Sequence, residues 1–330
     1  MLLIAALCFP FVSRAQDPNA GQRPFAFVNL DFDARTMALG GASIALPNDL
    51  YGVFSNPAAA GFISQREAVV GVRSVIQDVF GGPLAYAMPY SHYGTFGINL
   101  TTVSYGSMKE VQEGPDGLPL YTNNTWSAYS VAGQISWSKI VWDQLALGVA
   151  LRGLYERIGS TSAEGYAWDA ACVQAGLQYR MNDSRLILGL VLSNAGFMTS
   201  QLVNDLKLPL TLSAGVSYVP YYIPTVRLAL DLQQTADATL MYKPGVEFNI
   251  YKKYFFGRLG YRFGEHDLEE VFKEIRGESS DGYQKTTWYG PAFGVGFVTD
   301  VNRVNLNIDA AVQFIDNGDP VPCLSLLVKF

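Results

Sequence analysis

The sequence predicts an all-β protein, a transmembrane antiparallel β-barrel of about fourteen strands with an N-terminal hatch segment in its lumen. Three observations predict this fold class. Only 16% of the 330 residues are charged and 13% are aromatic, whereas soluble domains carry about 25% charged residues. Apolar residues alternate with small or polar ones over long segments, which is the period of a β-strand. No stretch after the N-terminus supplies the roughly 18 consecutive apolar residues of a spanning helix.

The first element, residues 1–15, has the features of a secretory signal peptide. Leu2 to Val12 is a short apolar run, and Ser13 and Ala15 are small residues placed as at a cleavage site. No Lys or Arg precedes the run, which makes the signal atypical, and a disordered or buried N-terminus is the alternative. We expect an exported protein in which Cys172 and Cys323 are isolated, inert thiols, because two distant cysteines make no disulfide framework.

Residues 16–65 lack the long alternation and are expected to form a separate segment. Gly40 and Gly41 allow a turn with positive φ. Asn56 followed by Pro57 is a helix-start signal, with Asn as the cap and Pro at the first helical position. A compact segment that precedes a wide barrel fits inside the lumen, where it plugs the pore. An arm in the periplasm is the alternative.

Residues 66–330 are expected to form the barrel. A soluble sandwich also has one apolar and one polar face. Here the apolar face is nearly continuous and the other face is small and polar, which suits lipid outside and a polar lumen inside. The candidate strands lie near 66–76, 82–90, 93–104, 125–138, 144–155, 167–180, 186–194, 208–219, 224–234, 242–251, 254–263, 288–299, 303–314 and 321–330.

The lengths and connections of these strands favour an outer-membrane barrel of a Gram-negative cell. Most candidates reach the 9–11 residues that a tilted strand needs to cross a bilayer. Short connections alternate with long ones, as periplasmic turns alternate with extracellular loops. The long ones are 105–124, 156–166, 195–207 and 264–287. The chain ends on Leu324–Phe330, which resembles the terminal-strand signal that the barrel-assembly machinery of bacteria reads.

Several charged residues have the parity of the inward strand face. They are Arg73, Arg152, Arg227, Asp231, Glu247, Arg258, Arg262, Arg303 and Asp309. Unpaired charges in a closed lumen are costly. We therefore expect this lumen charge network to pair internally or with the plug, for which Asp33 and Asp49 are candidate partners. A path for ions or substrate is the alternative.

The N-terminal motifs resemble the hatch signature of the FadL-like superfamily, and more narrowly its PorV/PorQ branch. The residues that carry the resemblance are Ala34-Arg35, Ala38-Leu39-Gly40-Gly41-Ala42 and Asn56-Pro57-Ala58. The lead-in Phe25–Leu30 and the later Val103–Gly106 are more similar to PorQ than to PorV. The resemblance covers most of the chain and implies a fourteen-stranded outer-membrane barrel with a hatch. It also implies a non-enzymatic anchor or shuttle for secreted and surface proteins in type IX secretion. The broader FadL group moves hydrophobic small molecules such as long-chain fatty acids.

Two loops are candidate partner-binding surfaces. In loop 264–287 an apolar stripe has helical spacing, formed by Leu268, Val271, Phe272 and Ile275. Such a stripe either covers the barrel mouth or docks a partner protein by helix-in-groove packing. Loop 105–124 is the second candidate.

No catalytic, metal or cofactor site is predicted. His92 and His266 fall in a predicted turn and a predicted loop, so they do not share a lumenal strand face with a Ser or Cys nucleophile. A net charge of −6 argues against nucleic acid as a partner. Three functions are weighed. A type IX anchor, which predicts a sealed barrel with polar inward faces, is favoured. A FadL-type transporter predicts an apolar pocket between hatch and wall and a lateral opening. An outer-membrane enzyme is disfavoured.

Overall fold

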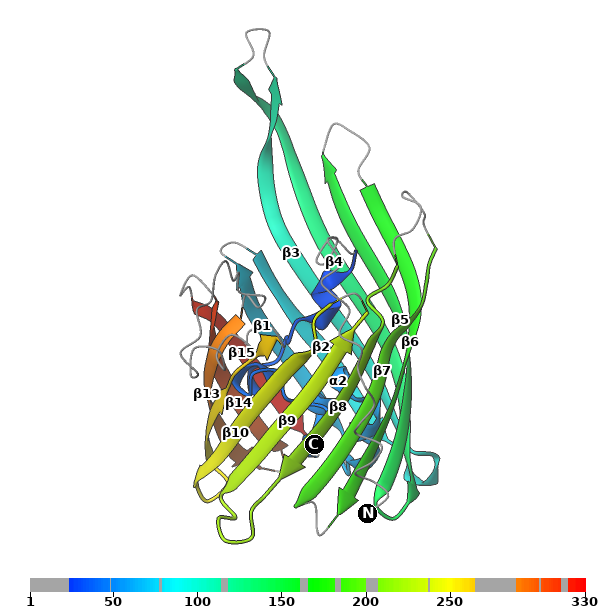
Figure 1. The fold of residues 1–330 in the computed structure, drawn as a ribbon, viewed down its shortest axis with the longest axis vertical. Helices are drawn as coiled ribbons and strands as arrows, with labels where there is room; N and C mark the ends of the chain where they lie inside the picture. The colour runs from blue at the N-terminus through cyan, green and yellow to red at the C-terminus, as the bar shows by residue number, and fades with distance from the viewer. Residues whose placement is uncertain are drawn as a thin grey trace, which may run out of the picture.

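The computed structural model describes residues 24–47, 49–76, 79–113, 118–160, 166–181, 185–199, 207–236, 238–264, 289–302, 304–315 and 320–330. Its strands form one antiparallel sheet that closes on itself (Figure 1). β11 and β12 both pair with β10 and are two pieces of one strand. The described chain therefore folds as a closed fourteen-strand barrel, which confirms the predicted fold class.

The strands are β1 (Glu67–Ile76), β2 (Val79–Pro89), β3 (Thr95–Glu113), β4 (Pro119–Trp142), β5 (Leu145–Ser160), β6 (Tyr166–Met181), β7 (Leu186–Met198), β8 (Thr211–Tyr218), β9 (Val226–Thr235), β10 (Met241–Tyr251), β11 (Phe255–Gly260), β12 (Phe263–Gly264), β13 (Tyr289–Val301), β14 (Val304–Ile315) and β15 (Pro320–Lys329). Each predicted strand has a counterpart here. β1 pairs with β15, so the first and last strands close the barrel on one side.

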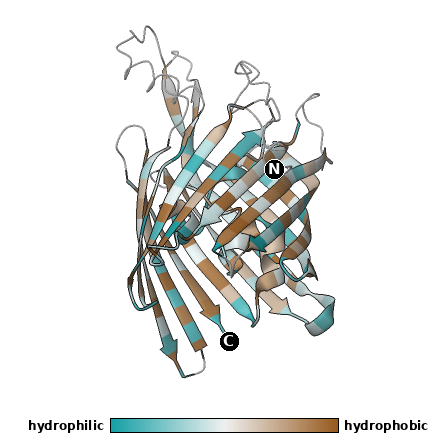
Figure 2. Cartoon of the chain, turned by 60° about the horizontal axis from the view of Figure 1, so that its bottom comes forward, coloured by the Kyte–Doolittle hydropathy of each residue, from teal (hydrophilic) through white to brown (hydrophobic). Residues whose placement is uncertain are grey.

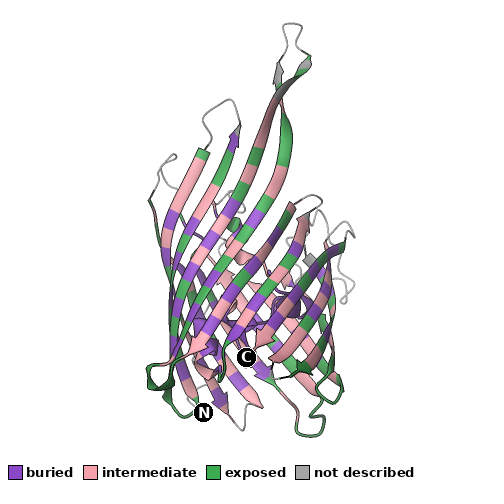
Figure 3. Cartoon of the chain, turned by 180° about the vertical axis from the view of Figure 1, so that it is seen from behind, coloured by how far each residue is buried: buried purple, intermediate pink, exposed green. Residues whose placement is uncertain are grey.

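The alternating sequence pattern becomes an apolar outside and a polar inside. Along the strands, hydrophobic and hydrophilic residues alternate (Figure 2), and so do exposed and buried ones (Figure 3). The exposed residues include Leu84, Ile98, Ile135 and Val295. Exposed aromatic residues gather at the end with the short turns, among them Tyr90, Tyr93, Trp142, Tyr221 and Tyr222. An apolar band with an aromatic girdle is the surface expected in a bilayer.

The predicted extent of three long loops is wrong, and one of them is 195–207, into which β7 continues as far as Met198. Strands β3 and β4 continue into the predicted loop 105–124 and stay paired up to Glu113↔Pro119, and β5 continues to Ser160. β3 and β4 rise well beyond their neighbours in Figure 1. Above the bilayer neither face of a strand needs to be apolar, so the hydropathy alternation fades. Backbone pairing does not depend on that alternation, and the strands go on.

The described residues before β1 contain four short helices. These are η2 (Ala26–Asn29), α1 (Ala34–Ala38), α2 (Leu50–Ser55) and η3 (Pro57–Phe62), and a further turn of 3₁₀ helix, η4 (Ser91–Tyr93), lies between β2 and β3. No helix of the described residues has the length and apolar character needed to span a membrane.

The described part of this segment, residues 24–66, lies inside the barrel and is called the hatch from here on. α1 contacts β11, β13, β14 and β15, whereas η3 contacts β3, β4, β5 and β6 on the opposite wall. Figure 1 shows the segment, in blue, running within the ring of strands. Four apolar clusters join it to the wall, among them one around Phe25, Phe27 and Phe32. The hatch therefore spans the lumen from wall to wall.

Candidate functional site

The glycine pair of the hatch makes the predicted turn. Gly40 and Gly41 have φ of 67° and 91°, a region that side chains disfavour. The turn also presses on the wall: a Cβ on Gly40 would overlap the backbone of Tyr261, and one on Gly260 would overlap the backbone of Gly40. Glycine is thus needed on both sides of this contact, for space as well as for φ.

The Asn56-Pro57-Ala58 motif makes the predicted helix start. The side chain of Asn56 accepts a hydrogen bond from the backbone N–H of Ala58, at 3.0 Å, and Pro57 occupies the first position of η3. Asn56 Nδ2 also donates to the carbonyls of Ile44 and Leu177. Asn56 is fully buried. One side chain therefore caps a hatch helix and ties two hatch segments to β6.

Arg35 of the hatch lies in a chain of buried ion pairs. It pairs with Asp49 of the hatch and with Glu247 of β10, whose Oε1 lies 2.9 Å from its NH2. Glu247 also accepts from Arg258 at 2.8 Å, and Arg258 donates to Asp309 at 2.6 Å. The chain thus alternates in charge from the hatch across β10 and β11 to β14. All its members are buried.

A second ion pair joins the hatch to the interruption between β11 and β12. Arg262, which lies in that interruption, pairs with Asp31 and donates to the carbonyl of Gly40 at 3.3 Å. Arg73 of β1 donates to the backbone carbonyl of Asp31 at 2.5 Å. Arg262 thus lies between the paired residues of β11 and β12, and its guanidinium contacts the hatch.

The expected partners Asp33 and Asp49 do not pair with arginines of the wall. Asp33 accepts from the backbone N–H of Thr36 at 2.7 Å and caps α1, whose first N–H groups have no partner within the helix. Asp49 pairs with Arg35 of the hatch. The acidic hatch residue that meets a wall arginine is Asp31. Burial raises the pKa of Asp33 to about 7.

Two other predicted lumen charges make weaker or different contacts. Asp231 accepts from the backbone N–H groups of Ser43 and Ile44, at 2.6 and 2.9 Å. Arg227 donates to Ser217 Oγ at 3.1 Å. Arg303 and the loop stripe Leu268, Val271, Phe272 and Ile275 lie outside the described residues. The signal segment 1–15 lies outside them too.

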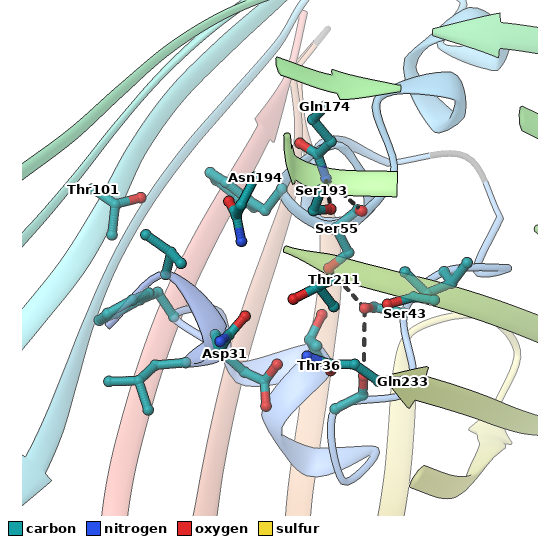
Figure 4. Close-up of a pocket in the computed structure, with 18 of the residues that line it drawn as sticks. Asp31, Thr36, Ser43, Ser55, Thr101, Gln174, Ser193, Asn194, Thr211 and Gln233 are labelled. Atoms are coloured by element: carbon teal, nitrogen blue, oxygen red, sulfur yellow. Dashed lines mark hydrogen bonds between the residues drawn. The ribbon is translucent and has the colours of Figure 1, made fainter. Parts of the chain in front are cut away.

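A cavity of about 110 Å³ lies between the hatch and the wall. Its hatch side carries apolar residues, among them Phe27, Leu30 and Phe54. Its wall side is polar and comes from β3 to β10 (Figure 4). The labelled wall residues there are Thr101, Gln174, Ser193, Asn194, Thr211 and Gln233. Polar residues of the hatch, such as Asp31 and Ser43, also line the cavity, so its apolar residues come mainly from the hatch but share that side with polar ones.

Arg152 is the one predicted charge of the cavity wall without an acidic partner among the described residues. Its guanidinium donates to Gln134 Oε1 at 2.7 and 3.0 Å, to Gln174 Oε1 at 3.1 Å and to Asn194 Oδ1 at 3.1 Å. Sequence reasoning missed these amides and Lys243, which lines the same cavity. Their inward strand parity was the available signal, but it does not separate cavity residues from residues that contact the hatch.

The outer face of β1, β2 and β3 carries a shallow groove. Pro83, which has no N–H, interrupts the β1–β2 ladder, so pairing runs from Val70↔Leu84 to Arg73↔Gly81 without the two pairs between. Phe80 and Leu100 line the groove. Gly81 lies at this place, and a Cβ on it would come within 2.7 Å of Phe32 of the hatch. Only the strand backbone separates lipid from hatch here.

Comparison with known proteins identifies the fold. No protein-family model matches the chain, and no curated protein matches it. Among solved structures, the Pseudomonas putida toluene transporter TodX matches with a TM-score of 0.59 and 13% identity, over 91% of this chain and 97% of that one. The chain shares the fold of that barrel.

Two further solved structures agree. The Ralstonia pickettii toluene transporter TbuX has a TM-score of 0.60 and 12% identity, over 92% and 98% of the two chains. A Pseudomonas aeruginosa FadL homologue has a TM-score of 0.53 and 11% identity, over 91% and 98%. These matches lie on the FadL side of the resemblance, and nothing in them supports the narrower assignment to PorV/PorQ. Identities this low establish the fold alone.

Proposed function

We propose that the chain is an outer-membrane conduit of the FadL type, which lets small, largely hydrophobic molecules pass the outer membrane. The observation that carries the proposal is the cavity between the hatch and the wall, with apolar residues of the hatch on one side. A barrel that serves only as an anchor has no need of such a cavity. The shared fold with two toluene transporters adds support, so the favoured reading passes from the type IX anchor to the transporter.

The groove at the β1–β2 seam suggests where a hydrophobic molecule enters. Thr101 lines the cavity and its neighbour Thr102 lines the groove, on opposite faces of β3. Two residue pairs are missing from the β1–β2 ladder at Pro83, which weakens the wall there. A molecule dissolved in the bilayer would reach the cavity by the shortest path at this seam.

An uptake assay with a cavity-filling variant tests the proposal. We would express the protein in the outer membrane of a Gram-negative host and follow the fluorescence of a hydrophobic naphthylamine dye as it passes that membrane. Thr101→Trp fills the cavity and is expected to reduce the protein-dependent uptake by at least half. Ile135→Trp is the matched control, because Ile135 of β4 is 62% exposed on the outer face and does not line the groove, and Trp is tolerated next to lipid. Equal uptake by both variants would contradict the proposal.

Anchoring of a surface protein is the second candidate, favoured by the hairpin of β3 and β4. Beyond Ser104, β3 has no pairing with β2, and β4 pairs with β5 only from Trp126 on, so residues 105–113 and 119–125 form a two-stranded ribbon. Met108 and Tyr121 are exposed on it. Affinity purification of the tagged barrel from its native membrane, with and without this ribbon, tests the candidate. Recovery of secreted proteins with type IX C-terminal domains only when the ribbon is present would favour it.

A further inference from the structure

The cavity has a cationic, hydrogen-bond-donating wall that the passage of hydrocarbons alone does not require. Arg152 is 8% exposed and lies on β5 among the side chains of β4, β6 and β7. All its contacts are neutral amide oxygens, and the described residues place no carboxylate within ion-pair distance of it. A buried charge without a counter-charge is costly. The cost is relieved when a ligand supplies the missing anion.

The surroundings of Arg152 offer unused donors. A guanidinium has five N–H groups, and the amide contacts use four of them, which leaves one on NH1. Because the oxygen of Gln134 faces Arg152, its Nε2 faces away, and this buried donor has no partner. Gln134 is 4% exposed and lines the cavity. Two donors on adjacent strands, both from residues that line the cavity, are thus unused.

The acidic residues of the cavity do not supply that acceptor. Asp31 is paired with Arg262, Asp33 caps α1, and Asp231 accepts from the backbone of Ser43 and Ile44. Each carboxylate is held by donors of the hatch or of the interruption after β11. Lys243, which is 7% exposed, adds a second cation to the lining.

We propose that the cavity binds a small organic anion, with its carboxylate on Arg152 and Gln134 and its hydrocarbon part against Phe27 and Phe54 of the hatch. This proposal rests on the proposed function and narrows its ligand class. The volume of about 110 Å³ is comparable with the roughly 150 Å³ of an engineered cavity that binds benzene. A compact, ring-sized acid therefore suits the cavity better than a long acyl chain.

The test uses three probes of one shape: benzoate, benzamide and toluene. Binding of each labelled probe to the purified full-length barrel in detergent is measured by equilibrium dialysis, with protein-free micelles subtracted. We expect benzoate to bind more tightly than benzamide, and Arg152→Gln to weaken benzoate binding at least about tenfold, as for the loss of one charge-assisted pair. Arg180→Gln is the matched control. Arg180 is also a buried lumen arginine bonded to a neutral amide, Gln178, but it does not line the cavity.

The heat-dependent shift of the folded barrel on gels shows whether each variant folds. If Arg152→Gln fails to fold, Gln134→Leu replaces it and removes the second donor. Equal binding of benzoate and benzamide, or unchanged benzoate binding in the variant, would overturn the anion site. Binding of toluene alone would overturn it while leaving the proposed function intact. No binding of any probe would count against both.

Discussion

At the scale of single residues, Glu247 is the carboxylate that joins the hatch to the wall. It holds Arg35 of the hatch and Arg258 of β11 at 2.8–3.0 Å. Removing one member of a buried ion pair leaves the others uncompensated, which costs about 3–5 kcal/mol. Because Glu247 bonds one arginine of the hatch and one of the barrel, its loss destabilises both the hatch contact and the barrel wall.

Glu247→Gln is therefore expected to destabilise the folded barrel by about 3 kcal/mol or more. The measurement is the urea concentration at which the heat-modifiable band is lost from gels. Asp300→Asn is the control, because Asp300 is exposed and accepts a hydrogen bond from the side chain of Asn305 rather than from a buried arginine. A Glu247→Gln barrel as stable as the control would show that the ion pairs do not hold the hatch.

Asp33 gives the hatch a dependence on pH. Burial raises the pKa of Asp33 from 3.8 to about 7, so the folded protein holds this proton over a range in which the unfolded chain has lost it. The free energy of unfolding then falls as pH rises from about 4 to 7, by at most about 4 kcal/mol at 1.36 kcal/mol per pKa unit. Above pH 7 the contribution is constant.

Asp33→Asn tests this sign. Asn still caps a helix but does not titrate, so the variant is expected to lose part of the fall in melting temperature between pH 5 and pH 8. Melting followed by circular dichroism at both pH values gives the comparison. An identical pH dependence in wild type and variant would mean that Asp33 is ionised in the folded state.

At the scale of elements, the hatch turn packs closely against the wall because both carry a glycine at the contact. Gly260 of β11 lies against Gly40 so closely that a Cβ would overlap its backbone. Gly133 of β4, in contrast, has no atom within 4 Å of the place of its Cβ. Both glycines lie in strands, but Gly260 faces the hatch, whereas Gly133 faces open space.

Gly260→Ala is expected to push the turn off the wall and expose the hatch to protease, whereas Gly133→Ala is expected to leave it protected. Limited proteolysis of the folded barrel, read by mass spectrometry, shows cleavage within the described hatch. Equal protection in both variants would mean that the hatch does not depend on this contact.

The strands could be predicted from the sequence because lipid imposes an apolar outer face on each of them. That constraint ends at the membrane surface, and the strand prediction fails beyond it. The ribbon of β3 and β4 was therefore predicted to be a loop. Gly40, Gly41, Asn56 and Pro57 were predictable as local backbone signals. The pairing of Asp31 rather than Asp33 with the wall was not, because partners so distant in sequence are set by where the hatch crosses the barrel.

At the scale of the whole molecule, the hatch stands between the cavity and the far side of the lumen. α1 and η3 contact opposite walls, and the clusters and ion pairs hold the segment between them. A molecule that passes from the cavity to the far side of the lumen is therefore expected to displace part of the hatch. Passage through the lumen therefore requires the hatch to move.

A reversible cross-link between hatch and wall tests this claim most directly. A Cβ on Gly61 of the hatch would lie 3.0 Å from the Cβ of Ala146 of β5, with no backbone atom closer than 3.5 Å, and a small shift gives the Cβ separation of about 3.5–4.5 Å in a disulfide. In the Gly61→Cys, Ala146→Cys variant we predict that dye uptake stops under oxidising conditions and returns after reduction, while either single variant is indifferent to the redox state. Undiminished uptake with the disulfide formed would contradict passage through the lumen.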